Sequence, residues 1–522
     1  MLLKIIFLLL LSLMMLIPSK HALHMFQQNR YELRRYGKWL NDNVSKKTLL
    51  TLIVALVLMI GGYMFLHGIL VYLGFGLMIV LAAYDYWRET KKSYIKPLVY
   101  TARVKRQIVV LAILDLLLIG SIVWFVALDD LAGLIIIAYV LNWLMIYPMA
   151  IITMPMEKLV QNYFIHDAKK ILKEHRNLIK IGITGSYGKT SSKNIVQAVI
   201  SDRFRSLMTP ASFNTPMGIT ITIREHLKPT HQVFVCEMGA DKVNDINYLC
   251  KFVKPQIGLV TSIGPQHLQT FKNMDNIIKE KMQMIECLPK DGLGIINIDN
   301  EYIRSYQIKN SCKIVTYGIK NDATYRAVDI QYSPNGSTFN VLYENEKYAF
   351  STKLLGEHNI MNILAAIAVA RYLGVGWAEL ARSVRQVDYV EHRLQVKKIN
   401  GYTFIDNAFN SNPEGAAMSL QVMSMMPNKR FIITPGLIDL GPQQYAMNHE
   451  FGRQMLGKVD VVILVGPTQT LPIYKGLEES NFKMADVYVV DTVKEAFNKV
   501  YALASKEDII LLENDLPDAF SK

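Results

Sequence analysis

The sequence predicts an α-helical membrane domain followed by α/β domains. Apolar residues make up 51% of the 522-residue chain, and most of the excess lies before residue 153. After residue 178, short apolar strands alternate with helices, which is typical of a parallel, doubly wound sheet. A chain of this length holds about three domains. We expect a transmembrane domain at 1–155, a central domain at 156–395 and a C-terminal domain at 396–522.

Long apolar runs predict the first domain. A helix crosses a bilayer with about 20 apolar residues, and about 17 is the lower limit. We therefore expect about five transmembrane helices, the first of them short. A cleaved signal peptide is the alternative for the first run. The five runs lie at 2–17, 49–66, 69–85, 108–127 and 131–152.

Charged residues predict the orientation of these helices. Segments 18–48 and 86–107 each carry seven Lys or Arg residues, whereas the connection at Asp129-Asp130 is acidic. The positive-inside rule places both basic segments, and everything after residue 152, in the cytoplasm. Asp115 lies inside the fourth run. A carboxyl group there is either functional or hydrogen-bonded to a neighbouring helix.

The net charge of +13 does not indicate a nucleic-acid partner. It is concentrated beside the apolar runs, and no basic stripe with interleaved aromatic residues appears. The four cysteines form no CxxC pair and accompany no histidine cluster, so we expect reduced thiols. The membrane is the partner that this charge pattern favours.

Short apolar strands predict two α/β regions. The first should form a parallel sheet with antiparallel strands at 321–355, around the turn Pro334-Asn335-Gly336. The second begins after about residue 396. Expected strands lie at 178–184, 233–237, 257–263 and 294–298, and then at 403–405, 431–433, 461–465, 487–490 and 509–512.

A glycine-rich turn joins the first strand to the following helix. It reads Thr184-Gly185-Ser186-Tyr187-Gly188-Lys189-Thr190. Glycines let backbone N–H groups close on phosphate oxygens, while the lysine reaches the β- and γ-phosphates and the threonine hydroxyl a Mg²⁺ ion. Ile183 stands where a full Walker A motif has its first glycine. The turn predicts a central domain of the P-loop ATPase type that binds ATP through Gly185, Ser186, Gly188, Lys189, Thr190 and Ser191.

Four further motifs follow in order. Glu237-Met238-Gly239-Ala240 ends a strand, where a carboxylate can hold Mg²⁺ over phosphates. Thr261-Ser262-Ile263-Gly264-Pro265-Gln266-His267 precedes Lys281 by fourteen residues. Gly356-Glu357-His358-Asn359-Ile360-Met361-Asn362 opens an alanine-rich helix, and Asp406-Asn407-Ala408-Phe409-Asn410-Ser411-Asn412-Pro413 follows a strand. Alone, a strand-end acid or a loop histidine is usually only a polar surface group.

Together and in this order, the five motifs resemble those of the Mur ligase family, which makes the peptide amides of bacterial cell-wall precursors. The resemblance covers about residues 178–515. It is greatest to the MurF type, because of the TGSxGKT form, the EMGA tetrapeptide, the stretch ending Asn412-Pro413, and Gly436–Gly441 followed by His449. It implies an ATP-dependent ligase that forms carbon–nitrogen bonds, with a Rossmann-like α/β C-terminal domain. It also implies that the protein is located in the bacterial cell membrane, with its catalytic domains in the cytoplasm.

The resemblance also implies roles for single residues. Lys189, His267, Lys281 and Arg393 would be catalytic. Thr190, Glu237, His267 and Lys281 would hold two Mg²⁺ ions, Lys281 as the family lysine that is often carbamylated. Asn359 and Asn362 would contact the adenine side of ATP, and Arg393 and Asp406 would close over the nucleotide from the domain junction.

The implied reaction activates a carboxylate acceptor as an acyl phosphate, which an amine then attacks. Two departures leave both substrates open. Membrane spans replace the N-terminal domain that holds the UDP part in MurF-type enzymes, and Leu511–Pro517 replaces a common Lys-Gly-Ser stretch. The acceptor could be a wall precursor, lipid-linked or not. The alternatives are a polymer-forming amide ligase of the poly-γ-glutamate kind and a membrane scaffold that binds nucleotide without turnover.

Overall fold

The computed structural model describes residues 2–43, 97–125, 142–408, 412–438 and 440–514, with scattered residues in 76–91 and 134–141. It forms two compact units, one up to Tyr163 and one from Phe164 onward. The first unit corresponds to the predicted 1–155 region. The second contains both predicted α/β regions, and the limits expected at 155 and 395 stay predictions.

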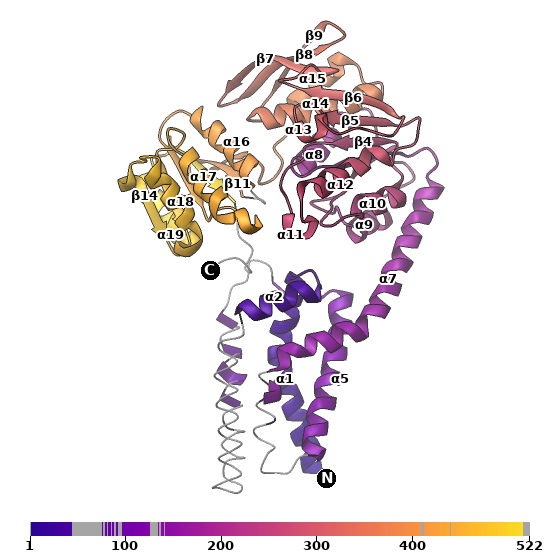
Figure 1. Ribbon diagram of the computed structural model, residues 1–522, viewed down its shortest axis with the longest axis vertical. Helices are drawn as coiled ribbons and strands as arrows, with labels where there is room; N and C mark the ends of the chain where they lie inside the picture. Colours follow the sequence, from indigo (N-terminus) through magenta and orange to yellow (C-terminus); the bar gives the residue numbers. More distant parts are fainter. Residues whose placement is uncertain are drawn as a thin grey trace. The chain divides into compact units, whose positions relative to one another are not determined.

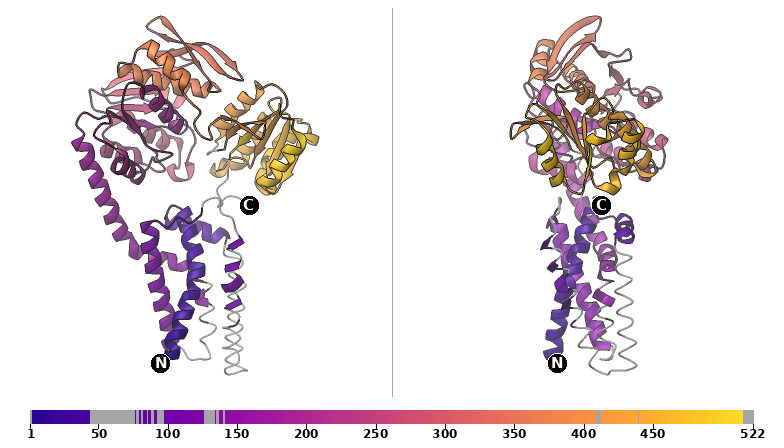
Figure 2. Two further views of the ribbon diagram at one scale, coloured as in Figure 1. Left: turned by 180° about the vertical axis from the view of Figure 1, so that it is seen from behind. Right: turned by 90° about the vertical axis from the view of Figure 1, so that its left-hand side faces the viewer.

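Helices build the first unit. They are α1 (Leu2–Gln28), α2 (Leu33–Asn43), α5 (Ala102–Phe125), η1 (Asn142–Met145) and the first part of α7 (Ile146–Glu174). Figures 1 and 2 show α1 and α5 side by side. Arg106 of α5 forms a two-point ion pair with Glu157 of α7, at 2.7 and 2.8 Å. These contacts make the described part of the unit a packed helical bundle.

Helix α1 differs from the sequence prediction. We expected an apolar run to end at residue 17 and a basic loop to cover 18–48. Instead α1 continues through Pro18 to Gln28, and α2 follows after a short turn. The physical reason is packing, because Leu23 and Phe26 are buried in the same core as Tyr36 of α2. Burial of these side chains stabilises helix beyond the proline, whose usual effect is to interrupt it.

One helix in the described residues, Ala102–Trp124, is long and apolar enough to cross a membrane. The expected run at 49–66 lies outside the described residues, and those at 69–85 and 131–152 lie partly outside. The predicted domain of about five spans is therefore not confirmed.

A nine-stranded sheet forms the first part of the second unit, in the order β2-β3-β1-β4-β5-β6-β7-β8-β9. All neighbours from β2 to β7 are parallel, and β7, β8 and β9 pair antiparallel. This confirms the predicted antiparallel segment and joins it to the main sheet. The strands are β1 (Ile179–Thr184), β2 (Ser206–Met208), β3 (Val233–Glu237), β4 (Ile257–Val260), β5 (Leu293–Asn297), β6 (Lys313–Gly318), β7 (Tyr325–Ser333), β8 (Gly336–Tyr343) and β9 (Glu346–Thr352).

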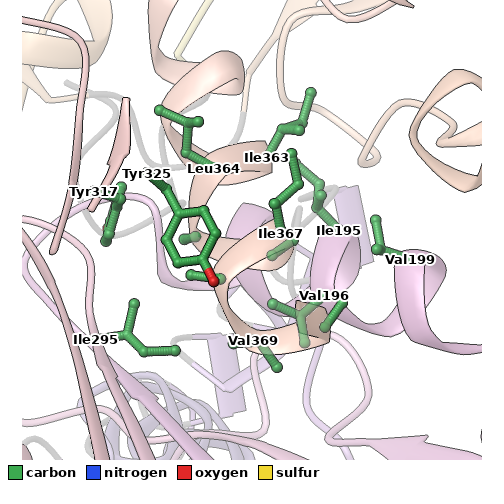
Figure 3. Packing of buried hydrophobic residues seen from close by; sticks show 14 of the residues in the cluster. Ile195, Val196, Val199, Ile295, Tyr317, Tyr325, Ile363, Leu364, Ile367 and Val369 are labelled. Carbon is green, nitrogen blue, oxygen red and sulfur yellow. The ribbon is translucent and has the colours of Figure 1, made fainter. Parts of the chain in front are cut away.

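Helices cover both faces of this sheet, so its strands are apolar on both sides. In β3, Val233 and Val235 join one core and Phe234 and Cys236 the other. Figure 3 shows the first core, where side chains of α8 and α14 meet Tyr325. The helices are α8 (Lys189–Ile200), α9 (Pro216–His226), α10 (Asp245–Val253), α11 (Leu268–Phe271), α12 (Met274–Glu286), α13 (Glu301–Arg304), α14 (Glu357–Tyr372) and α15 (Trp377–Gln386).

A six-stranded sheet follows, in the order β10-β11-β15-β12-β13-β14, parallel except for the β10–β11 pair. Its strands are β10 (Gln395–Ile399), β11 (Tyr402–Asn407), β12 (Arg430–Thr434), β13 (Val461–Val465), β14 (Val487–Val490) and β15 (Ile509–Glu513). Its helices are α16 (Pro413–Ser424), η2 (Gly441–Gln443), α17 (Gln444–Gln454), α18 (Pro467–Glu479), η3 (Met484–Asp486) and α19 (Val493–Leu503).

Every predicted strand is present, but β4 ends at Val260 rather than at residue 263. The sequence analysis missed β2, β6 and β10. Strand β2 has three residues, and β10 carries two lysines, so neither shows a clear apolar run.

Candidate active site

The predicted motifs converge at the carboxyl ends of β1, β3 and β4. Strand β1 lies between β3 and β4 in the sheet, so the chain leaves it at a point where the strand order reverses. Open α/β sheets bind ligands in the crevice at such a point. The glycine-rich turn after Thr184, Glu237 at the end of β3 and Thr261 after β4 all belong to this edge.

The turn after β1 requires both of its glycines. A Cβ atom at Gly185 would lie 2.1 Å from Thr261 Oγ1, and Gly188 has a positive φ of 79° just before α8 begins. Ser186 N–H donates to Ser262 O at 2.6 Å, which anchors the turn to the loop after β4. The turn therefore brings the positive end of the α8 dipole to this edge, an arrangement that attracts phosphate.

Lys189 folds back over this turn. Its ammonium donates to the carbonyls of Gly185 and Ser186 at 2.7 and 2.8 Å. Burial lowers the pKa of Lys189 to about 8, although the charge of Glu237 opposes this shift. A cation held by carbonyl oxygens in this way is ready to exchange them for phosphate oxygens, which carry full charge.

Glu237 is the carboxylate at the centre of the site. Its Oε1 accepts hydrogen bonds from Thr190 Oγ1 at 3.2 Å and from Asn214 Nδ2 at 3.0 Å. The other oxygen, Oε2, is buried and accepts no hydrogen bond in the described part of the chain, although Lys193 Nζ lies 3.2 Å away. A buried carboxylate oxygen beside a threonine hydroxyl fits the oxygen ligands that Mg²⁺ prefers.

A second group of charges lies beside the first. His267 Nε2 is 3.2 Å from Asp241 Oδ1, and Lys281 Nζ donates to Ala240 O at 3.4 Å. Lys281 is 1% exposed, and this burial, together with the charge of Lys189, lowers its pKa to about 7. A lowered pKa favours the neutral amine, which is the form that reacts with CO₂ to give a carbamate.

A cavity of about 410 Å³ opens beside the turn. This is within the size range of small-ligand sites. Side chains from both sheets line it. Among the predicted residues, Gly188, Ser191, Asn362 and Arg393 belong to its wall. Asn362 also accepts a hydrogen bond from Ser192 of α8 at 2.8 Å, so it fixes the phosphate-loop helix against α14.

Asn359 and Asp406 are absent from the wall of this cavity, as are Gly185, Ser186, Lys189 and Thr190 of the turn. Asn359 is buried, and its side chain donates to Leu355 O at 2.9 Å. The Asp406 carboxylate accepts from Lys397 at 2.6 Å and from His392 at 2.8 Å. Both side chains are engaged in local structure, and their contacts with ATP stay predictions.

Arg393 places a partly buried positive charge at the cavity wall. Desolvation lowers the pKa of its guanidinium, and the negative charges of Glu237 and Glu513 oppose that effect. It therefore lies in the field of one carboxylate from each sheet. Its expected role, closing over the nucleotide from the domain junction, stays a prediction.

The sequence analysis missed two side chains of the site. Asp241 follows the EMGA tetrapeptide directly and contacts His267, but an acid in a loop carries no signal of its own. His358 lines the cavity, and burial together with the charge of Arg393 lowers its pKa to about 4. Its Nδ1 atom is buried and has no hydrogen-bond partner in the described residues. Its position beside Asn359 in the fourth motif was the available signal.

Two family models match this chain, and together they cover more than half of it. Residues 183–370 match the Mur ligase middle domain, and residues 392–513 match the Mur ligase glutamate ligase domain. The chain belongs to the Mur ligase family. Members of this family are ATP-dependent ligases that form carbon–nitrogen bonds, so the predicted family and enzyme class are confirmed.

Individual proteins similar to this Mur ligase are of the predicted MurF type. The UDP-N-acetylmuramoyl-tripeptide–D-alanyl-D-alanine ligase of Bacillus subtilis is 28% identical over 337 residues, which is 64% of this chain and 72% of that protein. The enzyme of the same name from Haemophilus influenzae is 29% identical over 303 residues, 57% of this chain and 66% of that protein. The matches thus leave out part of each relative and more than a third of this chain.

Solved structures show the same fold. MurF from Acinetobacter baumannii superposes with a TM-score of 0.61 at 23% identity, over 68% of this chain and 77% of that one. MurF from Thermotoga maritima, solved in complex with ADP, gives 0.61 at 21% identity, over 68% and 80%. The predicted succession of a central ATPase-type domain and a C-terminal α/β domain is confirmed for the second unit.

Proposed function

We propose that this Mur ligase is a membrane-anchored enzyme that uses ATP to join a carboxylate to an amine, on a peptidoglycan precursor or a related acceptor. The observation that supports it most directly is the cluster of buried charges at the ends of β1 and β3. Glu237 and Lys281 are almost fully buried there, Lys189 is partly buried on the turn, and Gly188 and Ser191 on either side of it line a cavity of about 410 Å³. Buried charges are costly, and such clusters are typical of active sites.

Some of these residues would bind the phosphates of ATP, and others would bind metal ions. Lys189 and the N–H groups of the turn would bind the β- and γ-phosphates. Thr190 and Glu237 would hold one Mg²⁺ ion, with His267 and a carbamylated Lys281 holding a second. Bound there, Mg²⁺ supplies positive charge that offsets the charge on the transferring phosphoryl group.

The reaction proceeds in two steps. An acceptor carboxylate oxygen takes the γ-phosphoryl group from ATP, which gives an acyl phosphate and ADP. The amine nitrogen then attacks the acyl carbon, and inorganic phosphate leaves with the C–O bonding electrons. Lys189 and Arg393 keep positive charge beside the phosphoryl group throughout, and preorganised charge of this kind lowers the barrier most.

The first unit supports membrane anchoring by the way its residues are buried. Large apolar side chains are exposed along its helices, among them Leu117 (61% exposed), Trp124 (81%) and Leu159 (70%), whereas Asp115 is fully buried. Water-soluble bundles bury their apolar groups instead. In a bilayer, polar groups must face the interior of the bundle. We propose a multi-pass anchor of the bacterial cell membrane with the ligase unit in the cytoplasm.

Incubation of the full chain in detergent with ATP, Mg²⁺ and candidate substrates tests the function. UDP-linked and lipid-linked wall peptides serve as acceptors, with D-alanyl-D-alanine, glutamate and other amino acids as amines. Phosphate release that requires one acceptor and one amine supports the proposal. Chain growth with glutamate alone would favour the polymer-forming alternative, and nucleotide binding without turnover would favour the scaffold.

Alkaline carbonate extraction of cells that express the chain tests the anchor. We expect the protein to stay in the membrane pellet, because apolar spans resist this treatment. Release into the supernatant would contradict membrane insertion while leaving the ligase proposal intact.

A further inference from the structure

The Asp406–Pro413 motif presents Asn407, rather than Asp406, to the cavity. The two residues are neighbours in β11, and successive side chains of a strand point to opposite faces. Asp406 turns to Lys397 and His392, whereas Asn407 belongs to the wall of the cavity. A polar contact from this motif to a bound nucleotide is therefore available at Asn407.

Hydrogen bonds to Glu513 fix the orientation of the Asn407 side-chain amide. Glu513 of β15 stands opposite Asn407 in the parallel register. Its carboxylate oxygens accept hydrogen bonds from Asn407 Nδ2 at 3.1 and 3.0 Å. An ionised carboxylate can only accept, so the NH₂ group must face Glu513. The amide oxygen is left over, and no donor reaches it within the described residues.

Glu513 is well placed to keep this orientation. It is fully buried and accepts a further hydrogen bond from Ser419 of α16 at 2.5 Å. Figure 1 labels β11 and α16, the elements that bring Asn407 and Ser419 to Glu513. Burial keeps water from competing for these bonds. The network therefore has one stable arrangement.

We propose that Asn407 is a nucleotide-binding residue whose amide oxygen accepts a hydrogen bond from a ribose hydroxyl or the exocyclic amine of adenine, and that Glu513 positions it. The inference rests on the proposed use of ATP. Glu513 acts through Asn407 and is a positioning residue. Both candidate donors belong to the nucleoside part of ATP and neither belongs to its phosphates, so this contact would recognise the nucleoside.

The test measures binding of nucleotides to the full chain in detergent with Mg²⁺. The ligands are ATP, 2′-deoxy-ATP, 3′-deoxy-ATP and purine riboside triphosphate, each of the last three lacking one candidate donor. We expect Asn407→Leu to weaken ATP binding about tenfold, the effect of one hydrogen bond. For the analogue that lacks the contacted donor, wild type and variant should bind equally, which identifies the donor.

Glu513→Gln separates positioning from folding. A glutamine can both donate and accept, so the Asn407 amide can turn over, and discrimination between ATP and that analogue should fall at least threefold. Asn498→Leu on the exposed face of α19 is the matched control and should bind ATP like wild type. Thermal melting of each variant checks that it is folded.

Two results would overturn the inference. One is an Asn407→Leu variant that binds all four nucleotides like wild type. The other is a variant that loses the same factor for ATP and for every analogue. If the wild type binds no ATP at all, the proposed function fails together with this inference. If it binds ATP and only the discrimination pattern is absent, the inference alone is wrong.

Discussion

The two units of this protein bury polar groups for different reasons. In the ligase unit, the buried charges of Glu237 and Lys281 and the partly buried charge of Lys189 gather at one edge of a sheet. In the first unit, the buried carboxylate of Asp115 accepts hydrogen bonds from two other buried polar groups, Ser19 at 3.0 Å and Asn142 at 2.9 Å. Within the described residues, Glu237 Oε2 in the first cluster accepts no hydrogen bond, although Lys193 Nζ lies 3.2 Å away, whereas each carboxylate oxygen of Asp115 accepts one.

This difference distinguishes a ligand-binding site from a cluster of polar groups that only holds helices together. An unsatisfied buried oxygen costs free energy, and a ligand that binds it recovers that cost. A satisfied network already holds its helices together and gains little from a ligand. We therefore assign a catalytic role to the charges at the ends of β1 and β3 and a packing role to Asp115. The sequence had left open whether Asp115 is functional or is hydrogen-bonded to a neighbouring helix.

Lys189→Ala should have the largest effect. It removes the only predicted phosphate-binding ammonium of the turn, so we expect kcat to fall by about 10²–10³-fold or more. Phosphate release by the purified chain measures this, with circular dichroism as the control for folding. Unchanged phosphate release in Lys189→Ala would contradict the role of the turn.

Lys281→Ala should reduce activity by about 10- to 100-fold, the range for groups that support a metal ligand set. Lys279, exposed on the same helix, provides the matched control in Lys279→Ala. If the carbamate is the active form, wild-type activity should fall when bicarbonate is removed and recover when it is returned. Wild-type rates in Lys281→Ala would refute the assignment.

The pH dependence of stability should change when Lys281 is replaced by methionine. The pKa of Lys281 is about 7 in the folded chain, against an ordinary value of 10.5. Between these values the unfolded chain binds more protons, so the contribution of Lys281 to the free energy of unfolding rises with pH. Below pH 7 the full cost of burying the charge is present. Lys281→Met should therefore gain most stability over wild type near pH 6 and least near pH 10, as melting in both buffers will test.

Asp115→Leu should have the smallest effect. It leaves Ser19 and Asn142 without their carboxylate partner, and interhelical hydrogen bonds of this kind contribute about 0.6–2 kcal/mol. We expect a lower melting temperature in detergent and unchanged kcat, with Asp115→Asn closer to wild type. A large loss of kcat in a folded Asp115→Leu variant would show that the two units are not as different as we infer.

The sequence predicted those features that depend on local pattern. The phosphate-loop turn, its strand and its helix need only neighbouring residues, and each is present as expected. The hydrogen bonds between Asn407 and Glu513 join residues that lie 106 positions apart in the sequence, so no local pattern predicts them. The same holds for Asp241 beside His267 and for the helix that continues through Pro18, where tertiary packing overrides a local preference.

The most direct test of the account is phosphate release by the full chain and by Lys189→Ala, measured side by side with ATP, Mg²⁺, one acceptor and one amine. We predict release by the wild type that requires both substrates and yields one amide per phosphate, and none above background in the variant. Equal release by the two proteins, or wild-type release that ignores acceptor and amine, would contradict a ligase that works at the carboxyl ends of β1 and β3.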